Sequence, residues 1–446
     1  MLALAISLVI ISVATTVRAF ANASPPLRIP LAVFNGFYML TSVIGAILVT
    51  HPDFQFLWSI AAGGADVGWL LPGSTADYWI IVLAPFIVVN VAAPLLFVRM
   101  RAAAIGVARN LGFRVSWPSV AVPGILMLVY CVFNLAQHGY LGLGLLSSDN
   151  VGSYRENIQL REAMARELGD AHFGIVYMAL PAVCITALVR AARTRSAIWW
   201  LLFGALSSGA VFMYLTTLTK SNLLIFFIGV GVAIYMMRLI GLRGVALAAA
   251  LALLMLSAQE ALLAGSGWLE FFATTSNVVM RLSSAIPFYV EVFPQQEPFV
   301  GVDYGLGWFG IGPDVSPNLL VFNYMFPKIT WVQGAAPAAA HVAAYAQAGL
   351  WFSFLTMILV AAVIAFFGAL GKVARSALAR AAFVGGCVMC YYATQTDFVG
   401  TINHSYGYKW WLFGLLSIAA FEIASRWLLS VPRSSAAPSV RESRLP

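Results

Sequence analysis

Residues 78–98, YWIIVLAPFIVVNVAAPLLFV, form a run of 21 residues without a charged side chain. A helix of about 20 apolar residues is long enough to cross the hydrocarbon core of a bilayer. Comparable apolar runs occur at about 1–17, 29–50, 119–138, 172–190, 197–218, 221–240, 244–264, 345–368, 382–398 and 409–430. The sequence therefore predicts an all-α integral membrane protein with about eleven transmembrane helices.

The overall composition points to the same class. Hydrophobic residues make up 61% of the chain and charged residues 9%, and the mean hydropathy is +0.88. Ordinary soluble domains carry about 25% charged residues. We expect one polytopic membrane domain over residues 1–430, with larger extracytoplasmic loops at about 51–77, 139–171 and 265–344. Residues 431–446 are predicted to be a disordered cytoplasmic tail.

The basic residues predict the orientation of the chain, because Lys and Arg are retained on the cytoplasmic side. An extracytoplasmic amino terminus and a cytoplasmic carboxyl terminus place eighteen of the 25 basic residues inside. The same orientation places fifteen of the seventeen acids and all five histidines outside. We therefore expect a bacterial inner-membrane protein whose polar chemistry lies on the outer face.

The net charge of +8 does not indicate nucleic-acid binding, because the basic residues are spread over loops that flank the predicted spans. The four cysteines all fall within predicted spans, so the sequence supports neither a disulfide framework nor a zinc site. We expect Cys387 and Cys390 to be packing residues.

The loop at 139–171 contains a predicted amphipathic helix over residues 154–168. Stepping 100° per residue places an apolar face opposite a polar one. The apolar face holds Tyr154, Ile158, Ala165 and Leu168, and the polar face holds Arg155, Gln159, Glu162 and Arg166. Arg161 lies within the apolar face. Either it reaches a lipid phosphate from a helix on the membrane surface, or it binds an anion such as a diphosphate.

The loop at 265–344 combines glycine and aromatic residues, as in GVDYGLGWFG at 301–310. Aromatic faces stack on sugars, so this loop suits a carbohydrate or lipid ligand. Arg281 either pairs with Glu291 or Glu270 or serves a bound anion. His341, at the start of the ninth predicted span, either makes a structural hydrogen bond or acts chemically, with Tyr345 one turn later.

Two short patches resemble a known family. The polar turn TTLTKSN at 216–222, which opens the next span, resembles the basic turn of the Wzy-type O-antigen polymerases, and more distantly that of the O-antigen ligases. The approach from Pro337 through His341 and Tyr345 to Gly349-Leu350 resembles the segment that closes the family's large outer loop. The family's basic residue in the turn is Arg, whereas this chain has Lys220, a weaker bidentate phosphate ligand.

The resemblance implies a GT-C-like polymerase and ligase architecture and a metal-independent glycosyltransferase without a cofactor. The implied substrate is an undecaprenyl-diphosphate-linked oligosaccharide at the periplasmic face, and a polysaccharide chain-length regulator is an implied partner. On this basis Arg281, Arg161 and Arg155 would bind the diphosphate, with Lys220 and Tyr345 as further substrate contacts. His341 is the leading candidate for the base, followed by Asp303 and Glu291.

Three other functions remain open. A ligase would share the donor and the topology but transfer the glycan to another acceptor. A flippase or another transporter of lipid-linked oligosaccharides would need ionisable residues deep within its spans, whereas here the charges lie at the ends of the spans. A purely structural membrane subunit would not need charged and aromatic outer loops.

Overall fold

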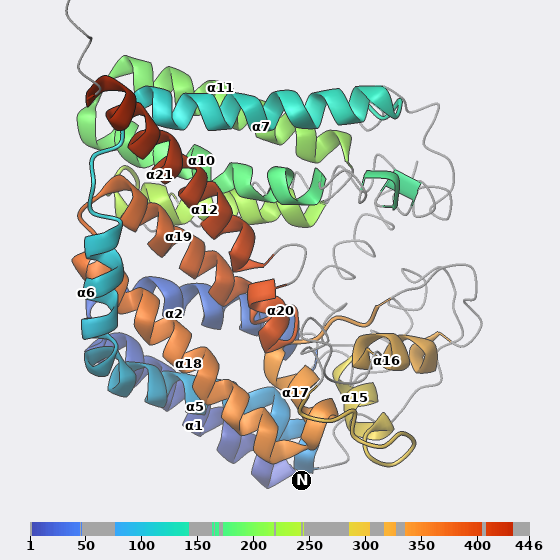
Figure 1. The fold of residues 1–446 in the computed structure, drawn as a ribbon. Coiled ribbons are helices and arrows are strands. Elements are labelled where there is room, and N and C mark those ends of the chain that lie inside the picture. Colours follow the sequence, from blue (N-terminus) through green and yellow to red (C-terminus); the bar gives the residue numbers. More distant parts are fainter. Residues whose placement is uncertain are drawn as a thin grey trace, which may run out of the picture.

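The computed structural model describes residues 2–44, 46, 76–141, 163–164, 166–168, 173–217, 220–241, 244, 285–303, 316–326, 335–403 and 407–430. Long helices lie side by side in one bundle (Figure 1). In chain order these are α1 (Leu2–Asn22), α2 (Pro25–Tyr38) with its π-helical continuation η1 (Met39–Ile44), α5 (Ala76–Arg99), α7 (Trp117–Gln137), α10 (Phe173–Thr194), α11 (Ala197–Thr216), α12 (Lys220–Met236), α18 (Leu350–Val373), α19 (Ala377–Tyr392) and α21 (Tyr408–Ser430).

Shorter helices lie at the two ends of this bundle (Figure 1). The helix α6 (Arg101–Asn110) crosses one end, which we call the α6 end. At the opposite end, the α17 end, lie α15 (Ile286–Val292), α16 (Pro317–Met325), α17 (Ala340–Ala348) and α20 (Phe398–Asn403).

Seven described helices are long and apolar enough to cross a membrane: α1, α2 with η1, α5, α7, α10, α11 and α18. Shorter apolar helices cover Asn222–Met236 and Ala377–Tyr392. The chain is therefore an α-helical, multi-pass membrane protein, and all regular structure in its described part is helical. The predicted span at 244–264 lies outside the described residues except for Gly244, so the count of eleven remains a prediction, as does the GT-C-like architecture. The predicted tail at 431–446 also lies outside them.

Two predicted spans were wrong in their limits. The span predicted at 382–398 is helix Ala377–Tyr392, and the backbone turns where Thr394 and Gln395 donate to the carbonyls of Tyr391 and Tyr392. The span predicted at 345–368 is two helices, α17 and α18, separated at Gly349, whose φ of +79° breaks the helical path. His341 and Tyr345 therefore belong to a separate short helix that precedes the span.

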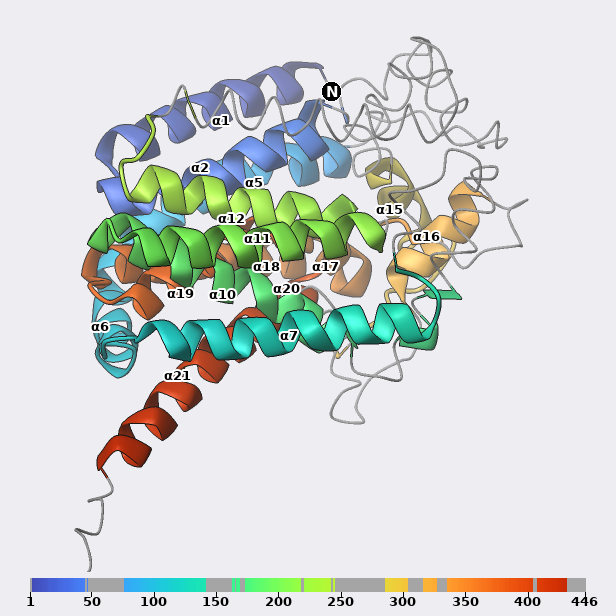
Figure 2. The ribbon, with the colours of Figure 1, turned by 90° about the horizontal axis from the view of Figure 1, so that it is seen from above.

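The bundle has two packed halves. One buried cluster is built mainly from α7, α10, α11, α12, α19 and α21. The other is built mainly from α2, α5, α15, α17 and α18, with Leu8 and Phe20 of α1 packed against it. Both clusters include residues of α18 and α19, so these two helices join the halves. Figure 2 shows α21 running out obliquely from the first half.

Asparagine side chains join α2 to α5 within the second half. Asn35 and Asn90 are buried and exchange amide hydrogen bonds of 2.9 and 3.0 Å. Asn90 also donates to Thr16 of α1 at 3.2 Å. Polar side chains between apolar helices are satisfied by such reciprocal bonds, which fix how neighbouring helices face one another. The pair therefore sets the register of α1, α2 and α5.

The α6 end gathers most of the described arginines, and two of them bond carbonyl groups of neighbouring loops. Arg193 donates to the carbonyl of Arg375, and Arg426 donates to that of Arg114 at 2.8 Å.

Most of the described acids belong to segments of the α17 end, namely Asp77, Glu167, Glu291, Glu297, Asp303 and Asp397. Glu422 is the described acid at the α6 end. Charge is thus divided between the two ends of the bundle.

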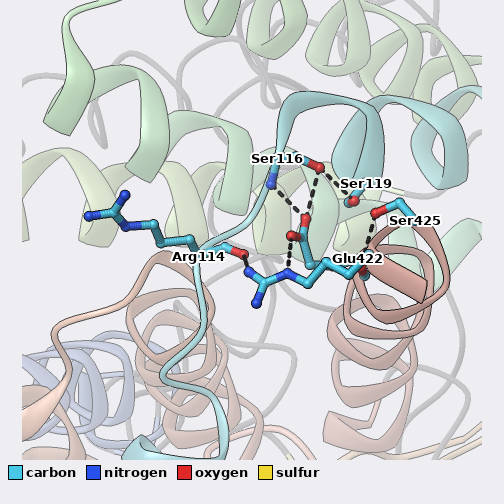
Figure 3. A network of polar contacts seen from close by, with 6 residues as sticks. Arg114, Ser116, Ser119, Glu422 and Ser425 are labelled. Atoms are coloured by element: carbon cyan, nitrogen blue, oxygen red, sulfur yellow. Dashed lines mark hydrogen bonds and ion pairs between the residues drawn. The ribbon is translucent and has the colours of Figure 1, made fainter. Parts of the chain in front are cut away.

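Glu422 fastens α21 to the start of α7 (Figure 3). Its Oε2 accepts from the Ser116 backbone N–H at 2.7 Å and from the Ser116 hydroxyl at 2.8 Å. Its Oε1 accepts from Arg426 Nε at 2.8 Å. The Arg426 side chain is 55% exposed, so we assign most of the stabilisation to the two Ser116 bonds. These bonds satisfy donors at a helix start, as a capping side chain does.

We expect Glu422→Ala to destabilise the protein by about 2 kcal/mol, because the Ser116 N–H and hydroxyl lose a charged acceptor. The measurement is the apparent unfolding temperature of the detergent-solubilised protein. Ser425→Ala is the matched control, since the Ser425 hydroxyl bonds the backbone carbonyl of Glu422 and not its carboxylate. Equal unfolding temperatures for the two variants would contradict this role of Glu422.

Candidate functional site

The helix α17 is held from both of its ends at the α17 end of the bundle. The Ala340 N–H donates to the Ala393 carbonyl beyond α19 at 2.9 Å. The N–H groups of Val300 and Gly301 donate to the carbonyls of Ala346 and Gln347, both at 3.0 Å. Backbone groups left unpaired at helix termini are thus satisfied by distant segments. This fixes the direction in which α17 projects its side chains.

His341 is buried between α17, α2 and α5, with 3% of its surface exposed. Its Nε2 lies 3.0 Å from the Ile81 carbonyl oxygen and 3.1 Å from the Tyr38 hydroxyl. The Tyr38 hydroxyl in turn donates to the Val82 carbonyl at 2.9 Å. The Tyr38 and His341 rings also meet edge to face, with centroids 5.3 Å apart. These contacts hold the His341 ring in one orientation.

These contacts decide which nitrogen of His341 carries the proton. A carbonyl oxygen only accepts, so Nε2 must donate to Ile81. The Tyr38 hydroxyl hydrogen is used by Val82, so its oxygen is free to accept from the same Nε2–H. In a neutral ring the lone pair then lies on Nδ1. Nδ1 is therefore the nitrogen of His341 that can accept a proton, and burial of the ring lowers the pKa of His341 to about 4.

Tyr345, one turn after His341, reaches α5 as well. Its hydroxyl donates to the Asp77 carboxylate at 3.4 Å, and its ring meets Phe299 edge to face at 6.1 Å. Asp77 is the first-turn acid of α5, where a negative charge is favoured by the helix dipole. The structure thus brings together His341, Tyr345, Tyr38 and Asp77, which we call the His341 cluster.

The two other candidate bases lie on segments next to α17. Glu291 is partly buried in α15, which packs against α17. Asp303 follows the Val300–Gly301 segment that bonds the end of α17. Among the described residues no hydrogen bond joins either carboxylate to His341. They flank the His341 cluster and are not part of it.

The predicted diphosphate ligands cannot be placed in this site. Arg155, Arg161 and Arg281 lie outside the described residues. Lys220 is the first residue of α12, and only its backbone is described. Described residues on either side of this turn share one partner on α10, because Asn222 donates to the Tyr177 hydroxyl at 3.0 Å and that hydroxyl lies 2.5 Å from the Thr217 hydroxyl.

The described part of the predicted amphipathic helix is helical and agrees with its pattern. Leu168 is buried and Arg166 is exposed. Glu167 accepts a 2.7 Å hydrogen bond from the Tyr140 hydroxyl, and this bond raises the pKa of the Tyr140 phenol. This segment therefore lies against the end of α7.

Tyr38 and Asp77 are the site residues that sequence reasoning missed. Asp77 directly precedes the predicted span at 78–98 on the predicted outer side, and an acid at such a position is the signal that could have found it. Tyr38 lies in the middle of the predicted span at 29–50 and gives no such signal. Their partners are about 300 and 270 residues away in the chain, so neither pairing can be read from local spacing. Within the described residues no group of three or more His, Cys, Asp or Glu is placed to hold a metal ion.

No protein-family model, curated protein or solved structure matches this chain. The geometry of the His341 cluster and the two patches of resemblance therefore carry the functional argument.

We expect Gly349→Ala to disturb the His341 cluster and to lower the apparent unfolding temperature. At φ +79° an alanine costs about 1–2 kcal/mol, and its Cβ would lie 3.2 Å from the Phe299 ring. Gly204→Ala in α11 is the matched control, because its Cβ meets nothing within 4 Å and alanine favours a helix. A Gly349→Ala protein as stable as the Gly204→Ala protein would contradict the strained junction.

Proposed function

We propose that this protein is a Wzy-type polymerase that joins undecaprenyl-diphosphate-linked oligosaccharide repeat units at the periplasmic face of a bacterial inner membrane. The observation that carries the proposal is the His341 cluster, a set of buried and partly buried polar groups at the end of the bundle opposite the described arginines of the α6 end. With arginines retained in the cytoplasm, the cluster faces the periplasm, where flipped lipid-linked units are available.

The proposed reaction breaks the bond between the anomeric carbon of the donor glycan and its diphosphate oxygen. The electron pair of that bond leaves with undecaprenyl diphosphate. A hydroxyl of the acceptor sugar attacks the anomeric carbon, and its proton passes to a base. The catalytic needs are therefore positive charge beside the departing diphosphate and a proton acceptor beside the attacking hydroxyl.

We assign the base to His341, with Nδ1 as the accepting nitrogen. Asp303 and Glu291 follow as candidates because they flank α17. The buried Nε2–H contacts with Ile81 and Tyr38 make Tyr38 a positioning residue, since they fix the tautomer that leaves Nδ1 available. A diphosphate bound nearby would favour the imidazolium formed in the reaction. The proton would thus be taken most readily when the donor is present.

We assign the diphosphate to Arg281, Arg161 and Arg155, with Lys220 as an auxiliary. Guanidinium groups bind phosphate oxygens in bidentate geometry, which suits a leaving group that gains charge. The loops that carry the three arginines connect to segments at the α17 end. Tyr345 is assigned to the sugar, which an aromatic face can stack against.

The test uses a host strain in which the gene is deleted and then restored as wild type, His341→Ala or His138→Ala. Surface polysaccharide and lipid-linked precursors are compared on gels. We expect His341→Ala to lose long chains while single-repeat material persists, because a general base contributes about 10²–10⁴ in rate. His138 is the matched control, since it is a partly buried histidine at the end of α7 whose Nδ1 lies 2.9 Å from the Asn134 carbonyl.

Protein amounts in the membrane are measured in parallel, and His341→Gln provides a second variant if the alanine variant is not retained. Unchanged chain length in stable His341 variants would remove the base assignment, and Glu291→Gln and Asp303→Asn would then be compared. Deletion that leaves long lipid-linked polymer but no attached glycan would mean a ligase. An unchanged profile after deletion would contradict glycan transfer.

A further inference from the structure

The described chain has two non-glycine residues with positive φ, and both are arginines at the α6 end. Arg195 (φ +51°) follows α10, and Arg238 (φ +57°) follows α12. Glycine adopts this conformation without a steric cost and is the usual residue after a helix. The negative end of the helix dipole favours an arginine at this position, but the positive φ is strained for any residue other than glycine. An arginine kept at such a position indicates a role for its side chain.

Arg238, but not Arg195, lines a cavity of about 510 Å³ at the α6 end. The cavity lies between the start of α2, the end of α12, the end of α18 and the start of α19. Its lining includes Arg238 and Arg380 together with apolar side chains such as Pro25, Ile29, Leu239 and Phe383. The volume is within the usual range for small-molecule sites.

The positive charge of this cavity is not balanced by any acidic side chain of its described lining. Its described lining contains two guanidinium groups and no carboxylate. Arg380 donates to the Ala374 carbonyl at 3.3 Å and to Met237 Sδ at 2.9 Å, which are both uncharged partners. Arg193 lies within electrostatic range of Arg380 and adds further positive charge. Glu422, the described acid at this end, is engaged by Ser116 and Arg426. An anion in this cavity, beside Arg380, would relieve the repulsion between Arg380 and Arg193.

We propose that this cavity is a binding site for an anionic phospholipid, with the lipid phosphate between Arg238 and Arg380 and an acyl chain along the apolar wall. Basic pockets between membrane helices bind such headgroups. The combination of two cations with an apolar wall favours a lipid over free phosphate, because a free phosphate would leave the apolar wall unused. The site is independent of the glycan-transfer chemistry at the α17 end.

The test is native mass spectrometry of the detergent-solubilised full chain with added phosphatidylglycerol or phosphatidylcholine. Wild type is compared with Arg238→Gly and Arg195→Gly. Glycine adopts the same positive φ without strain, so both variants should fold at least as well as wild type. We expect Arg238→Gly to weaken phosphatidylglycerol binding about fivefold, the effect of about one arginine near a lipid surface. Arg195→Gly should leave it unchanged.

A separate arm adds inorganic phosphate to the phosphatidylglycerol complex and is expected to leave the lipid bound. Displacement of the lipid by phosphate would overturn the lipid assignment in favour of a plain anion site. Equal losses in the two glycine variants, or equal retention of phosphatidylcholine, would overturn the proposal, since the α6 end would then attract lipid only as a diffuse basic ring. Apparent unfolding temperatures without added lipid check that both variants remain folded.

Discussion

The structure depends on the cost of placing charge in hydrocarbon. An ionised side chain in the middle of a bilayer is expensive, so a chain with 9% charged residues must collect them at the ends of its helices. In this protein the charged side chains described at the two ends of the bundle differ in sign and in what they contact. At the α6 end, Arg193 and Arg426 donate to the loop carbonyls of Arg375 and Arg114, and the Ser376 hydroxyl donates to the carbonyl of Leu111. The described acids lie mainly at the α17 end, where the described helices are short.

Several polar groups in the interior satisfy one another. Asn35 and Asn90 do so in mid-bundle, and Tyr177, Thr217 and Asn222 do so beneath the turn that carries Lys220. The His341 cluster differs because the neutral ring keeps one nitrogen lone pair beyond its Nε2 contacts. The buried Nε2–H of His341 is thus hydrogen-bonded as the structural polar groups are. The unused lone pair on Nδ1 distinguishes His341 from them.

Much of this fold could be predicted from apolar runs, because the 20-residue repeat of a spanning helix is a strong local signal. Long helices lie at ten of the eleven predicted positions, and Cys131, Cys184, Cys387 and Cys390 are buried and free. The break at Gly349 was not predicted, because hydropathy continues across it from Tyr345 to Gly368. The break depends on the backbone conformation of Gly349, and a hydropathy profile carries no information about backbone conformation.

The candidate site could be predicted only in part. His341 and Tyr345 were found from their position at the predicted outer face, and the structure places them on one short helix. Tyr38 and Asp77 were missed because their relation to α17 depends on how α2 and α5 pack, which no local pattern specifies. Glu422 shows the same limit at the α6 end, since its partner Ser116 is about 300 residues away. The roles of Arg155, Arg161, Arg281 and Lys220 stay predictions.

We propose that the His341 cluster faces the periplasm, where the proposed lipid-linked substrate would be available. The most direct test is labelling of single introduced cysteines with a membrane-impermeant maleimide, which the burial of all four native cysteines makes clean. Val302→Cys, beside Asp303, and Ile105→Cys, on α6, replace side chains that are 51% and 41% exposed. The account predicts that Val302→Cys is labelled in intact cells and Ile105→Cys only after permeabilisation. The reverse pattern would place the His341 cluster in the cytoplasm and contradict the account.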